Sequence, residues 1–207
     1  SKQPNSRWYS GSGIYRDVNL WTGKDVYISH DKLRITTLSV NDDMAVIEVC
    51  AQLKNILGHG LEAECLIEIK KDGQKTASDT QRVVFRSEQM QAVRVQIPIE
   101  HSKKWSPKQP ALYECHITTK FDDKICDEAV SNFGIRVLAL DPVHGLQING
   151  ETVKLRGTCI HHDNGVIGAE TFKEAEWYRC KRLKEAGFNA IRSAHHPMSR
   201  AMLDACD

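Results

Sequence analysis

Residues 44–53 read MAVIEVCAQL, and this stretch decides the fold of the larger part of the chain. Apolar side chains occupy every second position, and polar side chains stand between several of them. In an extended strand a period of two places alternate side chains on opposite faces, which is the pattern of a half-buried β-strand. The side chains expected to point inward are Ala45, Ile47, Val49, Ala51 and Leu53.

The same alternation recurs along residues 26–138. Residues 61–70, LEAECLIEIK, repeat it, and Lys71-Asp72-Gly73 then supplies the residues of a tight turn. Further runs of this kind lie at 93–97, at 113–119 and near 125–138. About seven short strands in roughly 110 residues, without a helix among them, predict two antiparallel sheets packed face to face as an immunoglobulin-like β-sandwich.

After Asp141-Pro142 the pattern changes to alternating strand and helix. The turn Asn149-Gly150 introduces a buried-type strand over 153–160, and a second strand is expected over 188–192. A helix between them begins at Thr171, where Glu174 three residues later predicts a capping box. On this helix Phe172, Ala175, Leu183 and Ala186 share one face, with Cys180 at its edge and Gly187 at the C-terminal cap.

A further helix is expected from Ser199 to the last residue. Strand, helix, strand, helix in this order specifies a right-handed parallel unit that cannot cover its own sheet. The fold class predicted is mainly β, a sandwich followed by a βαβ(α) unit; if this unit is the first portion of a (β/α)8 TIM barrel, the barrel is truncated and only two of its eight strands are present. Uncovered barrel strands of this kind also predict that the isolated chain self-associates.

Composition excludes several classes of function. The 207 residues include 28 basic and 27 acidic side chains, and no basic block stands out that would neutralise a run of phosphates, so nucleic acid is not expected as a partner. There is no apolar run of 18 residues and no signal peptide at the N-terminus, so no membrane partner is expected.

The seven cysteines are odd in number and scattered, and most are embedded in apolar patterns. We interpret them as reduced core thiols of a cytoplasmic protein, with the alternative that a signal peptide was lost with a missing N-terminus.

Two polar clusters follow the two parallel strands. His161-His162-Asp163-Asn164 comes after the first strand, and Arg192-Ser193-Ala194-His195-His196 ends the second. The carboxyl ends of adjacent parallel strands lie about 4.8 Å apart and carry the functional site in such folds. We therefore expect the two clusters to be neighbours in space.

These residues carry a resemblance to a known family. Residues 189–197, NAIRSAHHP, are similar to the signature of family 2 glycoside hydrolases that ends the second barrel strand, with His196 in place of the usual tyrosine. Residues 155–163, LRGTCIHHD, resemble the first barrel strand of that family. Three shorter segments, in the family's order, resemble the end of its jelly-roll domain and the strand entry and exit of its immunoglobulin-like domain: 12–18, 105–113 and 133–136.

The resemblance implies three domain segments. Residues 1–24 would close a sugar-binding jelly roll, residues 25–138 would form the immunoglobulin-like sandwich, and residues 139–207 would begin the catalytic barrel. The parent enzyme would be a β-galactosidase-like retaining glycosidase, in which one glutamate attacks the anomeric carbon and another protonates the leaving oxygen. Both would lie beyond residue 207, so no catalytic residue is expected in this chain and the fragment alone is predicted to be inactive.

Four residues are carried over from the family as pocket residues. Arg192 would hold the nucleophilic carboxylate ionised and oriented. His161 and His195 would bond hydroxyl groups of the sugar next to the scissile bond, and Asp163 would contribute a fourth group. The neighbouring His162 and His196 are expected only to cap strands or face water.

The acidic side chains of the predicted helix are not expected to be catalysts. Its glutamates, together with the one just before it, are expected to face outward or to cap the helix, namely Glu170, Glu174, Glu176 and Glu185.

Other readings stay open. The sugar would be a terminal β-galactoside, with β-glucuronidase or β-mannosidase specificity as alternatives, or the sandwich would be a carbohydrate-binding or adhesion module. A metal-binding protein is a rival because zinc-competent side chains converge on one face, at Cys159, His161, His162, Asp163, His195 and His196. We expect no metal and no cofactor in the fragment, whereas the resemblance allows a divalent cation in the full-length enzyme.

Overall fold

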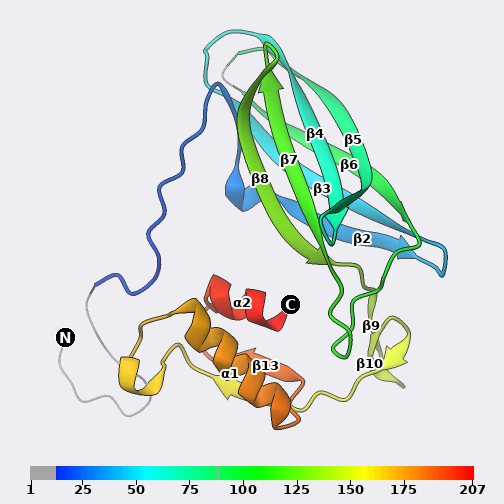
Figure 1. Ribbon diagram of the computed structural model, residues 1–207, viewed down its shortest axis with the longest axis vertical. Helices are drawn as coiled ribbons and strands as arrows, with labels where there is room; N and C mark the ends of the chain where they lie inside the picture. The colour runs from blue at the N-terminus through cyan, green and yellow to red at the C-terminus, as the bar shows by residue number, and fades with distance from the viewer. Residues whose placement is uncertain (1–12, 88) are drawn as a thin grey trace. The chain divides into compact units, whose positions relative to one another are not determined.

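The computed structural model describes residues 13–87 and 89–207, which belong to two compact units. The larger unit spans Trp21–Thr152. The smaller unit combines residues 13–20 with Val153–Asp207. In Figure 1 the larger unit runs from blue to yellow-green, and the helices of the smaller unit are orange and red.

The larger unit is built mainly from two antiparallel sheets that lie face to face (Figure 1). In the first sheet, β3 (Met44–Asn55) pairs along one edge with β1 (Val26–Ile28) and β2 (Arg34–Val40), and along the other with β6 (Met90–Glu100). A short 3-10 helix, His30–Lys32, joins β1 to β2.

The strands of the second sheet follow the order β5 (Gln74–Phe85), β4 (Leu61–Lys71), β7 (Leu112–Phe121), β8 (Lys124–Gly134). The prediction of a mainly β protein with a sandwich is therefore confirmed, and the immunoglobulin-like kinship of the sandwich stays a prediction.

Two hairpins of the second sheet close with two-residue turns. Asp72 and Gly73 connect β4 to β5 with φ of 51° and 78°, and Asp122 and Asp123 connect β7 to β8 with φ of 52° and 57°. Positive φ at both central positions matches the right-handed twist of the flanking strands, and aspartate tolerates this conformation better than most residues. The turn that Lys71-Asp72-Gly73 predicted is thus present.

The inner faces of the two sheets form one hydrophobic core. Every inward side chain predicted for residues 44–53 and 61–70 is buried, because β3 pairs with β6, and β4 with β7, without a register shift that would interrupt the period of two. Ile67 of β4 and Ile117 of β7 face each other across the sheet, and both are fully buried.

A smaller antiparallel sheet follows the sandwich within the same unit. Its strands are β9 (Leu138–Asp141), β10 (Gly145–Ile148) and β11 (Glu151–Thr152). Asn149, in the turn between β10 and β11, donates its side-chain amide to the Trp105 carbonyl at 2.9 Å and accepts the Val137 amide at 3.0 Å. The three predicted domain segments stay predictions, and part of the predicted jelly-roll segment 1–24 lies outside the described residues.

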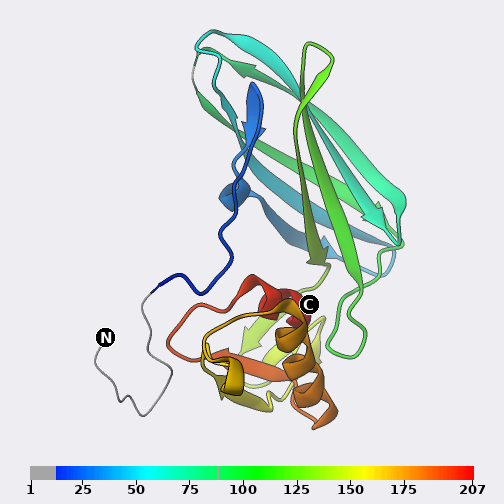
Figure 2. The same ribbon diagram turned by 60° about the vertical axis from the view of Figure 1, so that its left-hand side comes forward.

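The smaller unit contains a parallel pair of strands, β12 (Gly157–Ile160) and β13 (Ala190–Ser193) (Figure 2). Both are shorter than the runs predicted over 153–160 and 188–192. Just before β12, the backbone is bonded by the Asn189 side chain and not by a longer strand ladder. The Asn189 side-chain oxygen accepts a hydrogen bond from the Arg156 N–H at 2.7 Å, and its side-chain amide donates to the Lys154 carbonyl at 3.0 Å.

Two helices complete the smaller unit. Helix α1 (Lys173–Glu185) connects β12 to β13 after a 3-10 turn at Gly165–Ile167, and α2 (Arg200–Cys206) follows β13. This strand–helix–strand–helix order agrees with the predicted one, whereas the barrel that it would begin stays a prediction.

The N-terminal cap predicted from the sequence is present in α2 and absent in α1. The hydroxyl of Ser199 accepts the Met202 amide at 3.1 Å and caps α2 as predicted. The capping box at Thr171 is wrong, because α1 begins at Lys173 with Phe172 as an N-cap that makes no side-chain bond. The Thr171 hydroxyl lies 2.9 Å from the Nε2 atom of His162 instead.

All seven cysteines are free. Burial raises the pKa of Cys65 and of Cys115 to about 12, so both core thiols stay protonated at neutral pH. The prediction of core thiols is wrong for Cys159 and Cys206, which are exposed. Across the described part of the chain, no helix is both long enough and apolar enough to traverse a bilayer.

Candidate functional site

The loops that follow β12 and β13 bring two of the predicted pocket residues together. The rings of His161 and His195 lie with their centroids 5.1 Å apart. His195 has a φ of 66°, in the left-handed region that residues other than glycine adopt uncommonly, although histidine does so more often than most. Such a backbone costs about 1–2 kcal/mol and persists where the surroundings impose it, which is common at binding sites.

Arg192 lies near the carboxyl end of β13, directly beside Cys159 of β12 in the parallel register. Its guanidinium is exposed and donates from Nη1 to the Cys159 sulfur at 3.6 Å. An exposed guanidinium that donates to a weak thiol acceptor still has donors to offer to a carboxylate.

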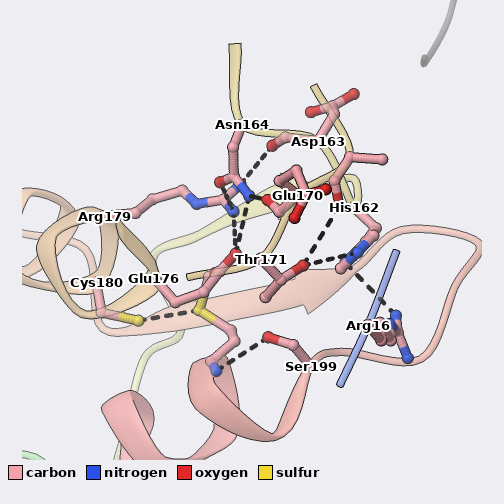
Figure 3. Close-up of polar contacts among 12 residues, drawn as sticks. Arg16, His162, Asp163, Asn164, Glu170, Thr171, Glu176, Arg179, Cys180 and Ser199 are labelled. Carbon is pink, nitrogen blue, oxygen red and sulfur yellow. Dashed lines mark hydrogen bonds and ion pairs between the residues drawn. The ribbon is translucent and has the colours of Figure 1, made fainter. Parts of the chain in front are cut away.

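Asp163 and Asn164 are held by the helix that follows them. Arg179 of α1 donates to the Asp163 carbonyl at 3.0 Å and to the Asn164 side-chain oxygen. Figure 3 shows that the Asp163 carboxylate points away from this guanidinium. The backbone of the loop is thus bound to the helix, and the carboxylate of Asp163 is left for other contacts.

Glu176 completes this group and corrects an expectation. It was expected to face outward or to cap the helix, but only 1% of its surface is exposed. One of its oxygens, Oε1, accepts from Arg179 at 2.7 Å and from the Asn164 amide at 3.2 Å (Figure 3). A buried carboxylate is retained when it is paired and hydrogen-bonded, and these two donors provide that pairing.

His162 is not a solvent-facing cap, which corrects a second expectation. It is half-buried, its Nδ1 lies 3.5 Å from the Arg16 guanidinium, and its Nε2 lies 2.9 Å from the Thr171 hydroxyl (Figure 3). The Tyr15 ring lies beside it, with centroids 4.9 Å apart. A guanidinium only donates, so Nδ1 accepts and the ring proton belongs on Nε2.

Arg16 joins the same contact to the second loop. Its guanidinium also donates to the carbonyl of Pro197, beyond β13. The segment 13–20 therefore contacts both loops of the site, at positions 146 and 181 residues away in the sequence.

The neutral form of His162 predicts a pH dependence of stability. Burial, and then the Arg16 guanidinium, lower the pKa of His162 below its usual value. As the pH falls, His162 therefore takes up a proton at a higher pH in the unfolded chain than in the folded one. The contribution of neutral His162 to stability is fully present above about pH 6.5 and is lost as the pH drops below that value. A thermal melt series from pH 8 to pH 5 should show this loss in the wild type and a smaller loss in His162→Gln. Equal pH slopes in the two proteins would contradict the assignment.

Sequence reasoning missed the supporting residues of the site. Glu176 and Arg179 stand three residues apart, a spacing that signals a pair on one helix face, but a charged pair is normally placed on the solvent side. Arg16 belongs to the segment 12–18 that carried part of the family resemblance. Its partners, His162 and the Pro197 carbonyl, lie 146 and 181 residues further along the chain, where no local pattern points to them.

The structure supplies no support for the metal-binding rival. Among residues 13–87 and 89–207, no group of three or more histidine, cysteine, aspartate or glutamate side chains is arranged to hold a metal ion. The expectation of a fragment without metal or cofactor remains a prediction.

Comparison with known proteins relates the chain to one enzyme family. The family model described as glycosyl hydrolases family 2 matches residues 26–136. The chain is 31% identical over 218 residues to the β-galactosidase BoGH2A of Bacteroides ovatus, covering 100% of this chain and 24% of that protein. It is 29% identical over 205 residues to a putative β-glucuronidase of Formosa agariphila, covering 99% of this chain and 19% of that protein.

Solved structures show the same relationship. A family 2 glycosyl hydrolase from Bacteroides cellulosilyticus superposes with a TM-score of 0.90 at 34% identity, covering 98% of this chain and 26% of that one. The β-glucuronidase of Bacteroides uniformis superposes with a TM-score of 0.81 at 25% identity, covering 88% of this chain and 23% of that one. The chain thus spans between about a fifth and about a quarter of the length of these four proteins.

Proposed function

Because this chain belongs to glycosyl hydrolases family 2, we propose that it is part of a retaining glycosidase that hydrolyses terminal β-D-galactosides. The observation that carries the proposal is the pairing of His161 with His195, whose rings lie 5.1 Å apart on the loops after β12 and β13. Family membership and this pair together favour a sugar pocket at the carboxyl ends of the two strands.

Each pocket residue has a role in the proposed reaction. His161 and His195 bond sugar hydroxyls beside the scissile bond, and Asp163 adds a carboxylate acceptor. Arg192 orients the nucleophilic glutamate through charge-assisted hydrogen bonds. The two glutamates that react, as nucleophile and as acid/base, belong to parts of the enzyme that this chain does not contain.

Galactoside is the proposed sugar because the β-galactosidase of Bacteroides ovatus matches the whole chain at 31% identity. The second candidate is a β-glucuronide, which the relative from Formosa agariphila and the structure from Bacteroides uniformis favour. The two sugars differ in charge, since a glucuronide carries a carboxylate at C6 and a galactoside carries a neutral hydroxymethyl group. A direct comparison of substrates separates them.

The proposal is tested by nitrophenol release from nitrophenyl β-galactoside, β-glucuronide and β-mannoside. We expect the full-length enzyme to turn over the galactoside fastest, and the chain described here to release no nitrophenol from any of the three. Turnover by this chain alone would overturn the assignment of the reacting glutamates to other parts of the enzyme. Preference for the glucuronide or the mannoside would replace the proposed sugar and leave the pocket in place.

Self-association of the isolated chain also remains a proposal. Within the described residues, β12 and β13 pair only with each other, so each strand has one edge without a partner strand. Unpaired strand edges promote association between chains.

A further inference from the structure

The Glu176 carboxylate is a buried charge on a helix, and helix formation alone does not explain its burial. On α1 its immediate partner is Arg179, at 2.7 Å, and its second donor, Asn164 at 3.2 Å, comes from the loop after β12. The other carboxylate oxygen, Oε2, is buried and has no hydrogen-bond partner among the described residues. The charge of Glu176 is therefore balanced by Arg179 and by the loop.

The Arg179 guanidinium reaches three acceptors at once. Nη1 donates to the Asp163 carbonyl at 3.0 Å, and Nη2 donates both to Glu176 and to the Asn164 side-chain oxygen. Its side chain is 24% exposed, so most of the fork is enclosed. A planar fork can serve several acceptors in fixed directions, which a lysine ammonium cannot reproduce.

These contacts fall on the backbone that carries two of the proposed pocket residues. The acceptor carbonyl belongs to Asp163 itself, and His161 stands two residues before it. The loop also closes on itself, because the backbone N–H of Asn164 donates to the Gly168 carbonyl at 2.7 Å. The positions of His161 and Asp163 therefore depend on the group formed by Asn164, Glu176 and Arg179, which we call the helix clasp.

We propose that Glu176 and Arg179 are positioning residues, which set the placement of His161 and Asp163 for sugar binding through the helix clasp. The inference rests on the proposed function of the pocket and adds residues that do not themselves touch the sugar. A displacement of about 1 Å at groups that contact a substrate lowers activity by about a hundredfold, so a clasp that prevents such a shift has a measurable effect.

The same helix offers a matched control. Arg182 and Glu185 form an i,i+3 pair at 2.7 Å, as Glu176 and Arg179 do, but their side chains are 64% and 46% exposed. Arg182→Lys and Glu185→Gln therefore repeat the chemistry of Arg179→Lys and Glu176→Gln on the solvent side of α1. Exposed pairs of this kind contribute little to stability.

The test uses the full-length enzyme and the sugar that it hydrolyses fastest. kcat/KM is measured for the nitrophenyl glycoside and for its monodeoxy analogues, each lacking one hydroxyl. In Arg179→Lys and Glu176→Gln we expect kcat/KM for the parent sugar to fall about tenfold to a hundredfold. We also expect the preference for the parent sugar over at least one deoxy analogue to shrink. The variant already weakens the hydrogen bond to the hydroxyl that this analogue lacks, so loss of the hydroxyl costs less.

The preference ratio separates positioning from folding. A smaller folded fraction lowers kcat/KM for every sugar by the same factor and leaves the ratio unchanged. Unchanged ratios in both clasp variants, or equal changes in the clasp variants and in the controls, would overturn the inference while the proposed function stands. No turnover of any sugar by the wild-type enzyme would instead remove the proposed function.

Discussion

Replacing Arg192 by lysine in the full-length enzyme is expected to lower kcat by about a hundredfold to a thousandfold. Lysine keeps the positive charge but loses the planar fork, so it cannot hold both oxygens of a carboxylate in a fixed orientation. In the proposed reaction that carboxylate is the nucleophile, and its orientation matters most in the transition state. The loss should therefore appear in kcat rather than in KM.

The position of Arg192 in the fold makes this variant informative. It lies at the end of β13 with an exposed side chain that contacts the Cys159 sulfur. A change in this side chain therefore disturbs little of the surrounding packing. Steady-state kinetics on the preferred nitrophenyl glycoside, with a thermal melt of the same sample, separates activity from stability.

Arg200→Lys provides the control for Arg192→Lys. Arg200 lies on α2 in the same unit, is exposed, and pairs with Asp204 at 2.8 Å. We expect its kcat to stay within about twofold of the wild type, because an exposed i,i+4 pair contributes only a few tenths of a kcal/mol. A lower melting temperature with unchanged kcat in Arg192→Lys would show that this arginine has a structural role only.

Truncating Ile117 to alanine is expected to lower the free energy of unfolding of the sandwich by about 2–5 kcal/mol. Ile117 is fully buried in β7, an inner strand of its sheet. It faces Ile67 on β4 and Ala129 on β8. Removing its three carbon atoms beyond Cβ leaves a cavity between the two sheets, which surrounding side chains in a close-packed core fill only in part.

The control for Ile117→Ala is Val130→Ala on the neighbouring strand. Val130 lies in β8 with 58% of its surface exposed, so its truncation should change stability by no more than about 0.5 kcal/mol. Urea unfolding followed by far-UV circular dichroism measures both variants. Equal midpoints for the two would mean that the inner faces of the sheets do not carry the stability of this unit.

The sandwich was predictable because its signals are local. A strand repeats its environment every two residues, so the alternation in residues 44–53 was enough to assign the buried side of β3. The turn Asp72-Gly73 is equally local, since positive φ at two successive positions selects such residues. The strand, helix, strand, helix order after residue 153 followed from the same kind of pattern, although both parallel strands are shorter than expected and the small sheet of β9, β10 and β11 was not predicted.

The polar clusters were located for a similar reason. Parallel strands bring their carboxyl ends to one edge, so the placement of His161 near His195 follows from topology once two parallel strands are recognised. Specificity for one sugar does not follow from these residues, because relatives that act on different sugars share this part of the fold.

The sequence by itself thus determined the alternating faces, the turns and the neighbourhood of the two site loops, since each depends on residues close together in the chain. Only the tertiary structure decided which polar side chains leave the solvent. Glu176 is buried because Arg179 and the loop at Asn164 satisfy it, and His162 is enclosed because Arg16, 146 residues away, reaches it. Burial of a polar group depends on the partners that the fold supplies, and a local pattern contains no information about partners that are distant in the chain.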